Sequence, residues 1–157
     1  WYYERWYHPV VRELICLPEI EGNIKNAWKL INPKIEYEEF CESVKTLIKH
    51  KFIEKKENSY IQTHPALSSS EDLSKLTLRS YHKQMLGIAK NSLDSLDPKE
   101  RFAMSGTLAL SDSAYQKICH EIAEFQKKCL SIATEDTEKP QKVLLCQSLL
   151  IPLSHPS

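Results

Sequence analysis

Residues 22–63 read GNIKNAWKLINPKIEYEEFCESVKTLIKHKFIEKKENSYIQT, and this stretch is the strongest indication of the fold. From Glu36 onward, apolar side chains recur with the spacing of a helix that buries one face, at Tyr37, Phe40, Cys41, Val44, Leu47 and Ile48. A shorter run before Asn32-Pro33 repeats this spacing, at Ile24, Ala27, Trp28 and Ile31. Because proline disfavours helical geometry in the residue before it, we expect the first helix to end near Asn32 and the second to begin after the turn.

Two short extended segments follow the second helix. Residues 52–56 and 60–63 flank the polar sequence Glu57-Asn58-Ser59, whose length is typical of a hairpin connection. Two helices followed directly by a hairpin are the elements of a winged helix-turn-helix, with the hairpin as the wing. The alternative is a helical hairpin followed by an unrelated β-turn.

Charge qualifies this interpretation. Lys+Arg and Asp+Glu number 21 each, so the net charge is zero, which argues against a strong, indiscriminate DNA binder. The second helix begins with Glu36, Glu38, Glu39 and Glu42, whereas residues 45–56 are rich in lysine. If the chain binds DNA, we expect the lysines to contact phosphates and two hairpin side chains to reach a groove. These candidate DNA-contacting residues are Lys45, Lys49, Lys51, Lys55, Lys56, Asn58 and Tyr60.

The opening residues 1–17 combine five aromatic side chains with the pattern of a helix. The aromatic residues are Trp1, Tyr2, Tyr3, Trp6 and Tyr7. Aromatic residues on all sides of a helix require burial all round. We therefore expect an upstream segment of the same protein or a protein partner to cover them, the more so because the chain lacks an initiator Met. A nucleic-acid stacking platform is the alternative.

A linker at residues 63–70 separates two expected domains, 1–66 and 67–157. The capping box Ser68-x-x-Glu71 predicts the start of a long helix that ends before Asp97-Pro98. Its inward face is predicted at Tyr81, Met85, Ile88, Ser92 and Leu96.

The remaining sequence predicts a strand, a helix and a second strand. Residues 102–110 alternate between apolar and small or polar side chains, and residues 143–153 are nearly continuously apolar. Between them, Ser111 caps a helix with apolar residues 3, 4, 3, 4 and 3 apart, at Tyr115, Ile118, Ile122, Phe125, Cys129 and Ile132. We expect this seam to pack on the helix of residues 68–96, with a self-standing coiled coil as the alternative.

The two strands predict a βαβ crossover and parallel pairing. Since two parallel strands alone are marginal, we expect a second copy of the chain to complete the sheet in a homodimer. The expected fold is therefore α+β and mainly helical, a winged helix-turn-helix followed by a helix-strand-helix-strand α/β module.

No pattern in the sequence supports catalysis. Only Gly22, Gly87 and Gly106 occur, which excludes a phosphate-binding loop and a Rossmann fingerprint. His120 and Glu124 have the i, i+4 spacing of metal ligands but lack a third candidate, so a solvated helix face is expected there. We predict no catalytic residue, no metal and no cofactor.

The five cysteines lack C-x-x-C spacing and are interpreted as reduced core residues of a cytoplasmic protein. No apolar run is long enough to cross a membrane, and no signal peptide is recognised.

Four segments carry a resemblance to a known family. They are Tyr2-Tyr3-x-x-Trp6-Tyr7-His8-x-x-x-Arg12-Glu13-Leu14, the helix and hairpin block ending Tyr60-Ile61-Gln62-Thr63, Arg79-Ser80-Tyr81-His82-Lys83-Gln84-Met85-Leu86, and Gln147-x-x-Leu150-Ile151-Pro152-Leu153. The chain resembles, over nearly its whole length, a paralogous bacterial family with a domain of unknown function that is expanded in predatory and fibre-degrading bacteria. The resemblance implies a predicted helix-turn-helix regulator with additional sequence upstream, and it supplies no catalytic residue.

The leading hypothesis is a non-enzymatic, dimeric, DNA-binding domain of a transcriptional regulator. The main rival is a protein-interaction or dimerisation scaffold whose winged helix does not touch DNA, because four carboxylates near phosphates repel them, and acids at a helix N-terminus also complement the helix dipole. An enzyme is a third possibility, which a deep pocket lined by ionisable groups would favour.

Overall fold

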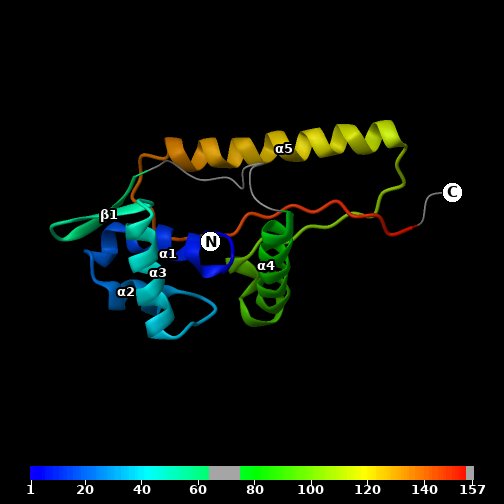
Figure 1. Cartoon of the computed structure of the whole chain (residues 1–157). Helices are drawn as coiled ribbons and strands as arrows, with labels where there is room; N and C mark the ends of the chain where they lie inside the picture. The colour runs from blue at the N-terminus through cyan, green and yellow to red at the C-terminus, as the bar shows by residue number, and fades with distance from the viewer. Residues whose placement is uncertain (64–74, 155–157) are drawn as a thin grey trace. The chain divides into compact units, whose positions relative to one another are not determined.

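The computed structural model describes residues 1–63 and 75–154, which are mainly helical and contain one two-stranded antiparallel sheet (Figure 1). The chain forms two compact units. Unit 1 comprises Trp1–Phe102 and Glu138–Val143, and unit 2 comprises Ala103–Thr137 and Leu144–Ser157. The domain boundary that we predicted at residue 66 lies outside the described residues. Helix α4, which we assigned to the second domain, belongs to unit 1.

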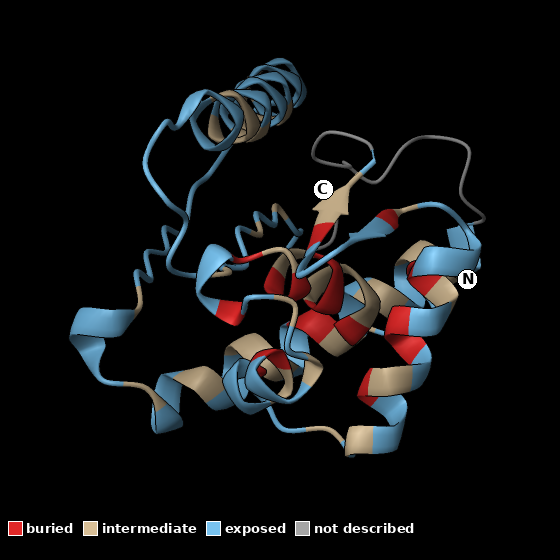
Figure 2. Ribbon diagram, turned by 90° about the vertical axis from the view of Figure 1, so that its left-hand side faces the viewer, coloured by how far each residue is buried: buried red, intermediate tan, exposed pale blue. Residues whose placement is uncertain are grey.

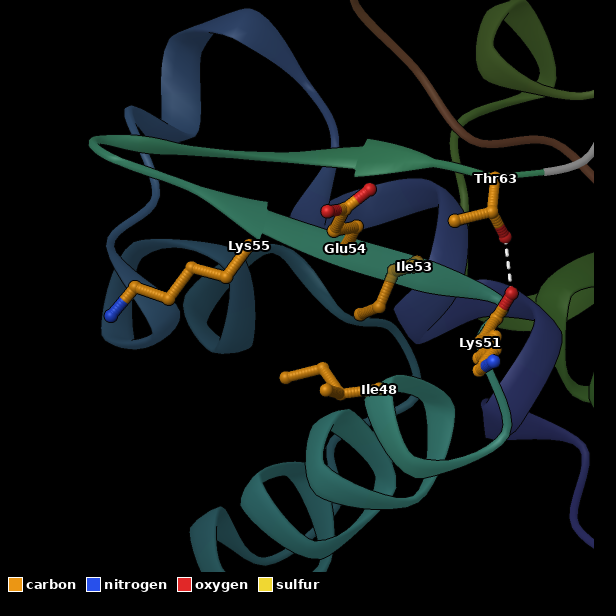
Figure 3. A pocket seen from close by; sticks show the side chains of 6 residues that line it. All are labelled: Ile48, Lys51, Ile53, Glu54, Lys55 and Thr63. Atoms are coloured by element: carbon orange, nitrogen blue, oxygen red, sulfur yellow. Dashed lines mark hydrogen bonds between the residues drawn. The ribbon is translucent and has the colours of Figure 1, made fainter.

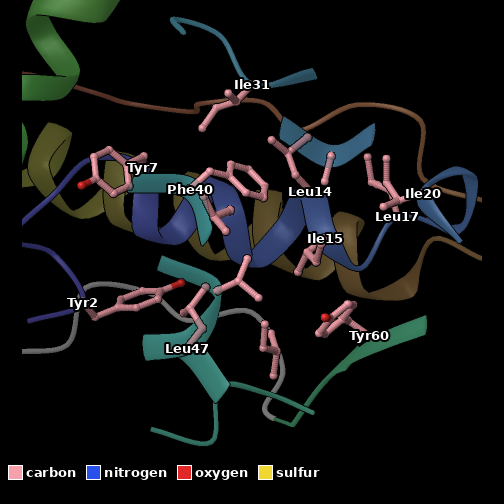
Figure 4. Close-up of a cluster of buried hydrophobic side chains, with 14 of the residues drawn as sticks. Tyr2, Tyr7, Leu14, Ile15, Leu17, Ile20, Ile31, Phe40, Leu47 and Tyr60 are labelled. Atoms are coloured by element: carbon pink, nitrogen blue, oxygen red, sulfur yellow. The ribbon is translucent and has the colours of Figure 1, made fainter. Parts of the chain in front are cut away.

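Unit 1 is built around helices α1 (Tyr7–Ile15), α2 (Ile24–Leu30) and α3 (Tyr37–Lys49), which pack on one another. A short 3-10 helix, η1 (Pro18–Ile20), connects α1 to α2. The core lies between these helices and the hairpin, with Val11, Ala27, Phe40 and Leu47 fully buried (Figures 2 and 4). The apolar stripes of the sequence therefore face a common centre.

Local capping signals explain where α2 and α3 begin. The Asn23 side chain accepts a hydrogen bond from the backbone N–H of Lys25 at the start of α2. At the start of α3, Glu36 and Glu39 form a reciprocal capping box, which satisfies two backbone donors that the helix leaves unpaired. Both helices were predicted from the sequence, and α2 ends at Leu30, slightly before the expected Asn32.

The hairpin consists of β1 (Ile53–Lys56) and β2 (Ser59–Gln62), paired antiparallel with Lys56 opposite Ser59. The connecting turn is Glu57-Asn58, because Ser59, which we placed in the connection, belongs to β2. Gly22 lies directly against this turn, where an added Cβ would come within 2.7 Å of the Asn58 carbonyl oxygen. Gly22 also has a φ of +69°, so both space and backbone conformation require glycine here.

The expectation that a partner covers the opening aromatic residues is wrong. Tyr2, Tyr3 and Tyr7 are buried in the core of unit 1, and Trp1 and Trp6 pack against it. The helix begins only at Tyr7, so the preceding residues run across the unit and present their rings to different neighbours. Tyr2 stacks on Phe52 and Tyr3 contacts the edge of Tyr81, which a continuous helix would not allow.

Helix α4 (Lys75–Ser95) joins unit 1 along the inward face that we predicted. Met85 is buried and Tyr81 packs against the core. The Gln84 side-chain amide accepts from the backbone N–H of Trp6 at 3.1 Å and donates to the carbonyl of Glu4 at 3.1 Å. The capping box Ser68-x-x-Glu71 lies outside the described residues. A second 3-10 helix, η2 (Pro98–Glu100), follows α4.

Unit 2 contains helix α5 (Asp112–Glu135), whose first turn is capped by Ser111 as predicted. The strands expected at residues 102–110 and 143–153 are wrong, because both segments are irregular and the one sheet of the described residues is β1–β2. An apolar pattern does not make a strand by itself, because a strand also needs a neighbouring strand to satisfy its backbone groups. The predicted βαβ module is therefore absent from the described single chain.

Candidate nucleic-acid interface

The solvent face of α3 changes charge along its length. Glu38, Glu42, Lys45 and Lys49 are all exposed and follow one another at i+4, i+3 and i+4, so they lie on one stripe of the helix. The stripe therefore has an acidic half, Glu38 and Glu42, and a basic half, Lys45 and Lys49. The two halves meet where the Lys45 Nζ lies 3.5 Å from the Glu42 carboxylate. The acidic half adjoins the N-terminus, where negative charge complements the helix dipole, and the basic half adjoins the hairpin.

Lys51 forms the corner between α3 and the hairpin. Its φ of +58° is left-handed, the backbone N–H of Phe52 donates to the Leu47 carbonyl at 2.9 Å, and that of Lys51 donates to the Ile48 carbonyl at 3.0 Å. These two hydrogen bonds define a Schellman motif, which ends the helix and reverses the chain. The hairpin therefore starts at Ile53 with little freedom relative to α3.

The lysines of the hairpin lie on opposite faces of β1. Figure 3 shows Lys55 and Ile53 on the α3-facing side of β1 and Glu54 on the other side. Successive side chains of a strand alternate, so Lys56 lies on the same side as Glu54. Both lysines are exposed. The basic residues therefore spread over two faces of the ribbon and are interrupted by an acid.

A shallow hollow of about 490 Å³ lies between the end of α3 and β1 (Figure 3). Its lining includes the side chains of Ile48, Lys51 and Lys55, so two of the predicted lysines meet at one place. The Thr63 hydroxyl donates to the Lys51 carbonyl and joins the end of the hairpin to its beginning. Ile48 and Thr63 were not predicted to line this hollow, since nothing in their local pattern distinguishes them from an ordinary helix position and a linker residue.

Asn58 and Tyr60, the two predicted groove-reaching residues, differ in position. Asn58 is exposed at the tip of the turn. Tyr60 is 6% exposed within the core, on the hairpin face that packs against the helices, and burial raises the pKa of its hydroxyl. The interpretation of Tyr60 as a DNA-contacting residue is therefore wrong. Strand alternation alone did not show which face of the hairpin would be covered.

A cluster of aromatic rings packs around the residues that lead into the hairpin. Trp1 stacks on His50 with ring centroids 4.5 Å apart and contacts Phe52 edge-on at 5.2 Å. Nearby, His8 Nδ1 lies 2.8 Å from the Ser43 hydroxyl, and burial lowers the pKa of this histidine. Burial also raises the pKa of Tyr81 to about 12, so its hydroxyl stays protonated. These rings serve packing and leave no open stacking face on Tyr2 or Tyr3.

Other polar groups give no sign of a reactive centre in the described parts of the chain. Residues 1–63 and 75–154 contain no cluster of three potential metal ligands. The five cysteines are free. We expected them in the core, but Cys146 is exposed and the other four are half-buried. Burial raises the pKa of the Cys16 thiol to about 12, which disfavours the reactive thiolate.

A family model described as Domain of unknown function (DUF4423) matches residues 1–147. The chain belongs to this family. No curated protein and no solved structure matches the sequence. The residues matched by the DUF4423 model include α5 as well as the lysine-rich hairpin. Among the described helices of the DUF4423 chain, none is long and apolar enough to span a membrane.

Proposed function

We propose that this DUF4423 chain is a non-enzymatic DNA-binding domain of a cytoplasmic transcriptional regulator, built on a winged helix. The observation that carries the proposal is the set of exposed lysines on α3, its Schellman corner and β1, namely Lys45, Lys49, Lys51, Lys55 and Lys56. Lysine side chains on a rigid corner favour contact with the phosphate backbone.

The basic end of α3, and not its acidic beginning, makes the proposed contact. In helix-turn-helix proteins the N-terminal residues of the recognition helix contact the base edges. Here Glu38 and Glu42 occupy that half and repel phosphates. The proposed contact therefore depends on phosphate neutralisation by Lys45, Lys49 and the hairpin, and Asn58 is the remaining candidate to reach a groove.

The proposal is tested by measuring the salt dependence of binding to a random-sequence DNA duplex by fluorescence anisotropy. We expect log K to fall linearly with log salt concentration, and the double variant Lys55→Glu, Lys56→Glu to reduce the slope by about two units, since about one is lost per phosphate contact. The double variant Lys83→Glu, Lys90→Glu, which makes the same charge change on exposed positions of α4, is the matched control. An unchanged slope in the hairpin variant would contradict the proposal.

A second candidate, a protein-interaction scaffold, is favoured by the mixed charge of the same surface. Glu54 interrupts the basic residues of β1, and the exposed acids of α3 lie beside the basic ones. The double variant Glu38→Lys, Glu42→Lys separates the two candidates. If DNA lies along α3, removing this repulsion strengthens DNA binding. If wild type and this variant both fail to bind the duplex at low salt, the scaffold is the better account.

A homodimer belongs to the same proposal. Two-fold symmetric dimers present two identical DNA-binding domains to the two halves of a palindromic site.

A further inference from the structure

Unit 2 has no core of its own. None of its described side chains is buried, in contrast to unit 1, and α5 is coloured exposed or intermediate along its whole length (Figure 2). Most of the large exposed hydrophobic side chains of the described chain lie in this unit: Met104, Leu108, Leu110, Tyr115, Phe125, Ile132, Leu144, Leu145, Leu149, Ile151 and Leu153. A folded helix of this length requires an apolar partner.

One edge of α5 is already in contact with its own unit. Gln126 donates to the Ser148 hydroxyl at 3.0 Å, and the sulfur atoms of Cys129 and Cys146 lie 4.0 Å apart. The extended segment after residue 144 therefore lies along this edge. The opposite edge of the seam stays open, with Phe125 54% and Ile132 62% exposed.

We propose that this open edge docks against a second copy of the chain, with the two α5 helices antiparallel. The seam residues are spaced 3, 4, 3, 4 and 3, so their pattern reads the same in both directions. A two-fold axis between residues 123 and 124, the midpoint of α5, places Tyr115 against the partner's Ile132, Ile118 against the partner's Cys129, and Ile122 against the partner's Phe125. Every seam residue then has an apolar counterpart.

Charge favours a second copy in this orientation. Glu121 and Lys128 flank the seam on its open edge and are both exposed. The antiparallel pairing brings Glu121 beside the partner's Lys128, and the symmetry repeats this contact. In a parallel pair, Glu121 would face the partner's Gln126 and Lys128 would face the partner's Ala133. Neither of these facing residues carries a charge.

The exposed apolar side chains of unit 2 supply a large part of the surface that a dimer needs. Each large hydrophobic side chain carries roughly 60–120 Å² of apolar area. With the exposed fractions of unit 2, the whole set offers several hundred Å² toward the roughly 800 Å² per partner of a standard interface. Only Tyr115, Phe125 and Ile132 of this set lie on α5, so the irregular segments of unit 2 must contribute to the interface as well. The surface specifies the homodimer of the proposed function, but it does not depend on DNA binding.

The test is sedimentation equilibrium of the full chain at micromolar concentration without DNA. We expect twice the monomer mass for the wild type. Glu121→Lys and Lys128→Glu each place like charges together, so each should raise the dimer dissociation constant about tenfold or more, and the double exchange Glu121→Lys, Lys128→Glu should restore it. Lys127→Glu makes the same charge change outside the seam and should leave the mass unchanged.

Phe125→Ala adds a test that does not depend on charge. It should abolish the dimer while the near-UV circular dichroism of the aromatic core of unit 1 stays constant, because Phe125 is exposed in the single chain and is not part of that core. A monomeric wild type, as expected if α5 packs on α4 of its own chain, overturns the proposal. A dimer unaffected by these variants also overturns it, because the contact then lies elsewhere. If the wild type has the dimer mass but does not bind DNA, the proposed function is refuted and the proposed dimer surface is not.

Discussion

Lys51 shows how a single residue sets the direction of the hairpin. It holds the left-handed position of the Schellman motif, which costs a side-chain-bearing residue about 1–2 kcal/mol that glycine avoids. The cost is tolerated because the two hydrogen bonds of the motif satisfy carbonyls at the end of α3.

Replacing Lys51 with glycine should therefore stabilise the fold. We expect Lys51→Gly to raise the free energy of unfolding by about 1 kcal/mol, measured by denaturant titration. Lys49→Gly, two residues earlier in the last turn of the helix, is the control and should lower it by roughly 0.5–1 kcal/mol. A destabilised Lys51→Gly would show that the Lys51 side chain contributes more than its backbone strain costs.

His8 makes stability depend on pH. Burial is the main cause of its lowered pKa, against the opposing effect of the Glu4 carboxylate. The unfolded chain binds a proton at this residue near pH 6.5, and the folded chain only at lower pH, so stability is fully present above about pH 6.5 and decreases as pH falls toward the folded pKa.

The comparison with His8→Gln isolates this contribution. Below about pH 6.5, we expect the free energy of unfolding to fall more steeply for the wild type than for His8→Gln, which has no titrating ring. Thermal unfolding across this pH range measures both. Parallel curves for the two proteins would contradict the role of His8.

At the scale of elements, α4 is attached to unit 1 by one side-chain amide as well as by apolar contacts. Gln84 makes complementary hydrogen bonds to the backbone of Glu4 and Trp6, which a leucine of similar size cannot replace. We expect Gln84→Leu to lower the free energy of unfolding by about 1–2 kcal/mol and to speed hydrogen exchange in α4. Lys83→Leu, on the exposed face of the same helix, should do neither.

The whole molecule combines a unit that has a core with one that lacks it. Helix α3 has four buried residues at its centre, namely Phe40, Ser43, Val44 and Leu47, whereas α5 has none. Elements without buried contacts open at low free-energy cost, and association stabilises the associated form in proportion to concentration.

Hydrogen exchange should therefore separate the two units. We expect α5 amides to exchange faster than α3 amides in dilute protein, and α5 protection to rise with protein concentration while α3 protection stays constant. Mass spectrometry of peptides from the two helices measures this. Strong, concentration-independent protection of α5 would indicate that its apolar seam is covered within one chain.

Local sequence was sufficient for α2, α3, α5 and the hairpin, because their signals act over a few residues. Asn23, Glu36 and Ser111 accept from backbone N–H groups two or three residues ahead. The 3.6-residue period marks a buried face, and a short polar run closes a hairpin. The resemblance to a family with a domain of unknown function depended on the helix and hairpin block and on residues 2–14, 79–86 and 147–153, and it is confirmed by the match over residues 1–147. The exposure of all five candidate lysines could also be expected, because charged residues seldom lie in a core.

Tertiary packing alone decided which aromatic residues are covered, and by what. Tyr2 and Tyr3 are buried because Phe52 and Tyr81, far along the chain, lie beside them, and Tyr60 is buried because its face of the hairpin turns toward the helices. The same dependence explains the missing strands. The apolar alternation at residues 102–110 is a property of one chain segment. A strand forms only where a second segment supplies hydrogen bonds, and the alternation of residues in the first segment does not show where that second segment lies.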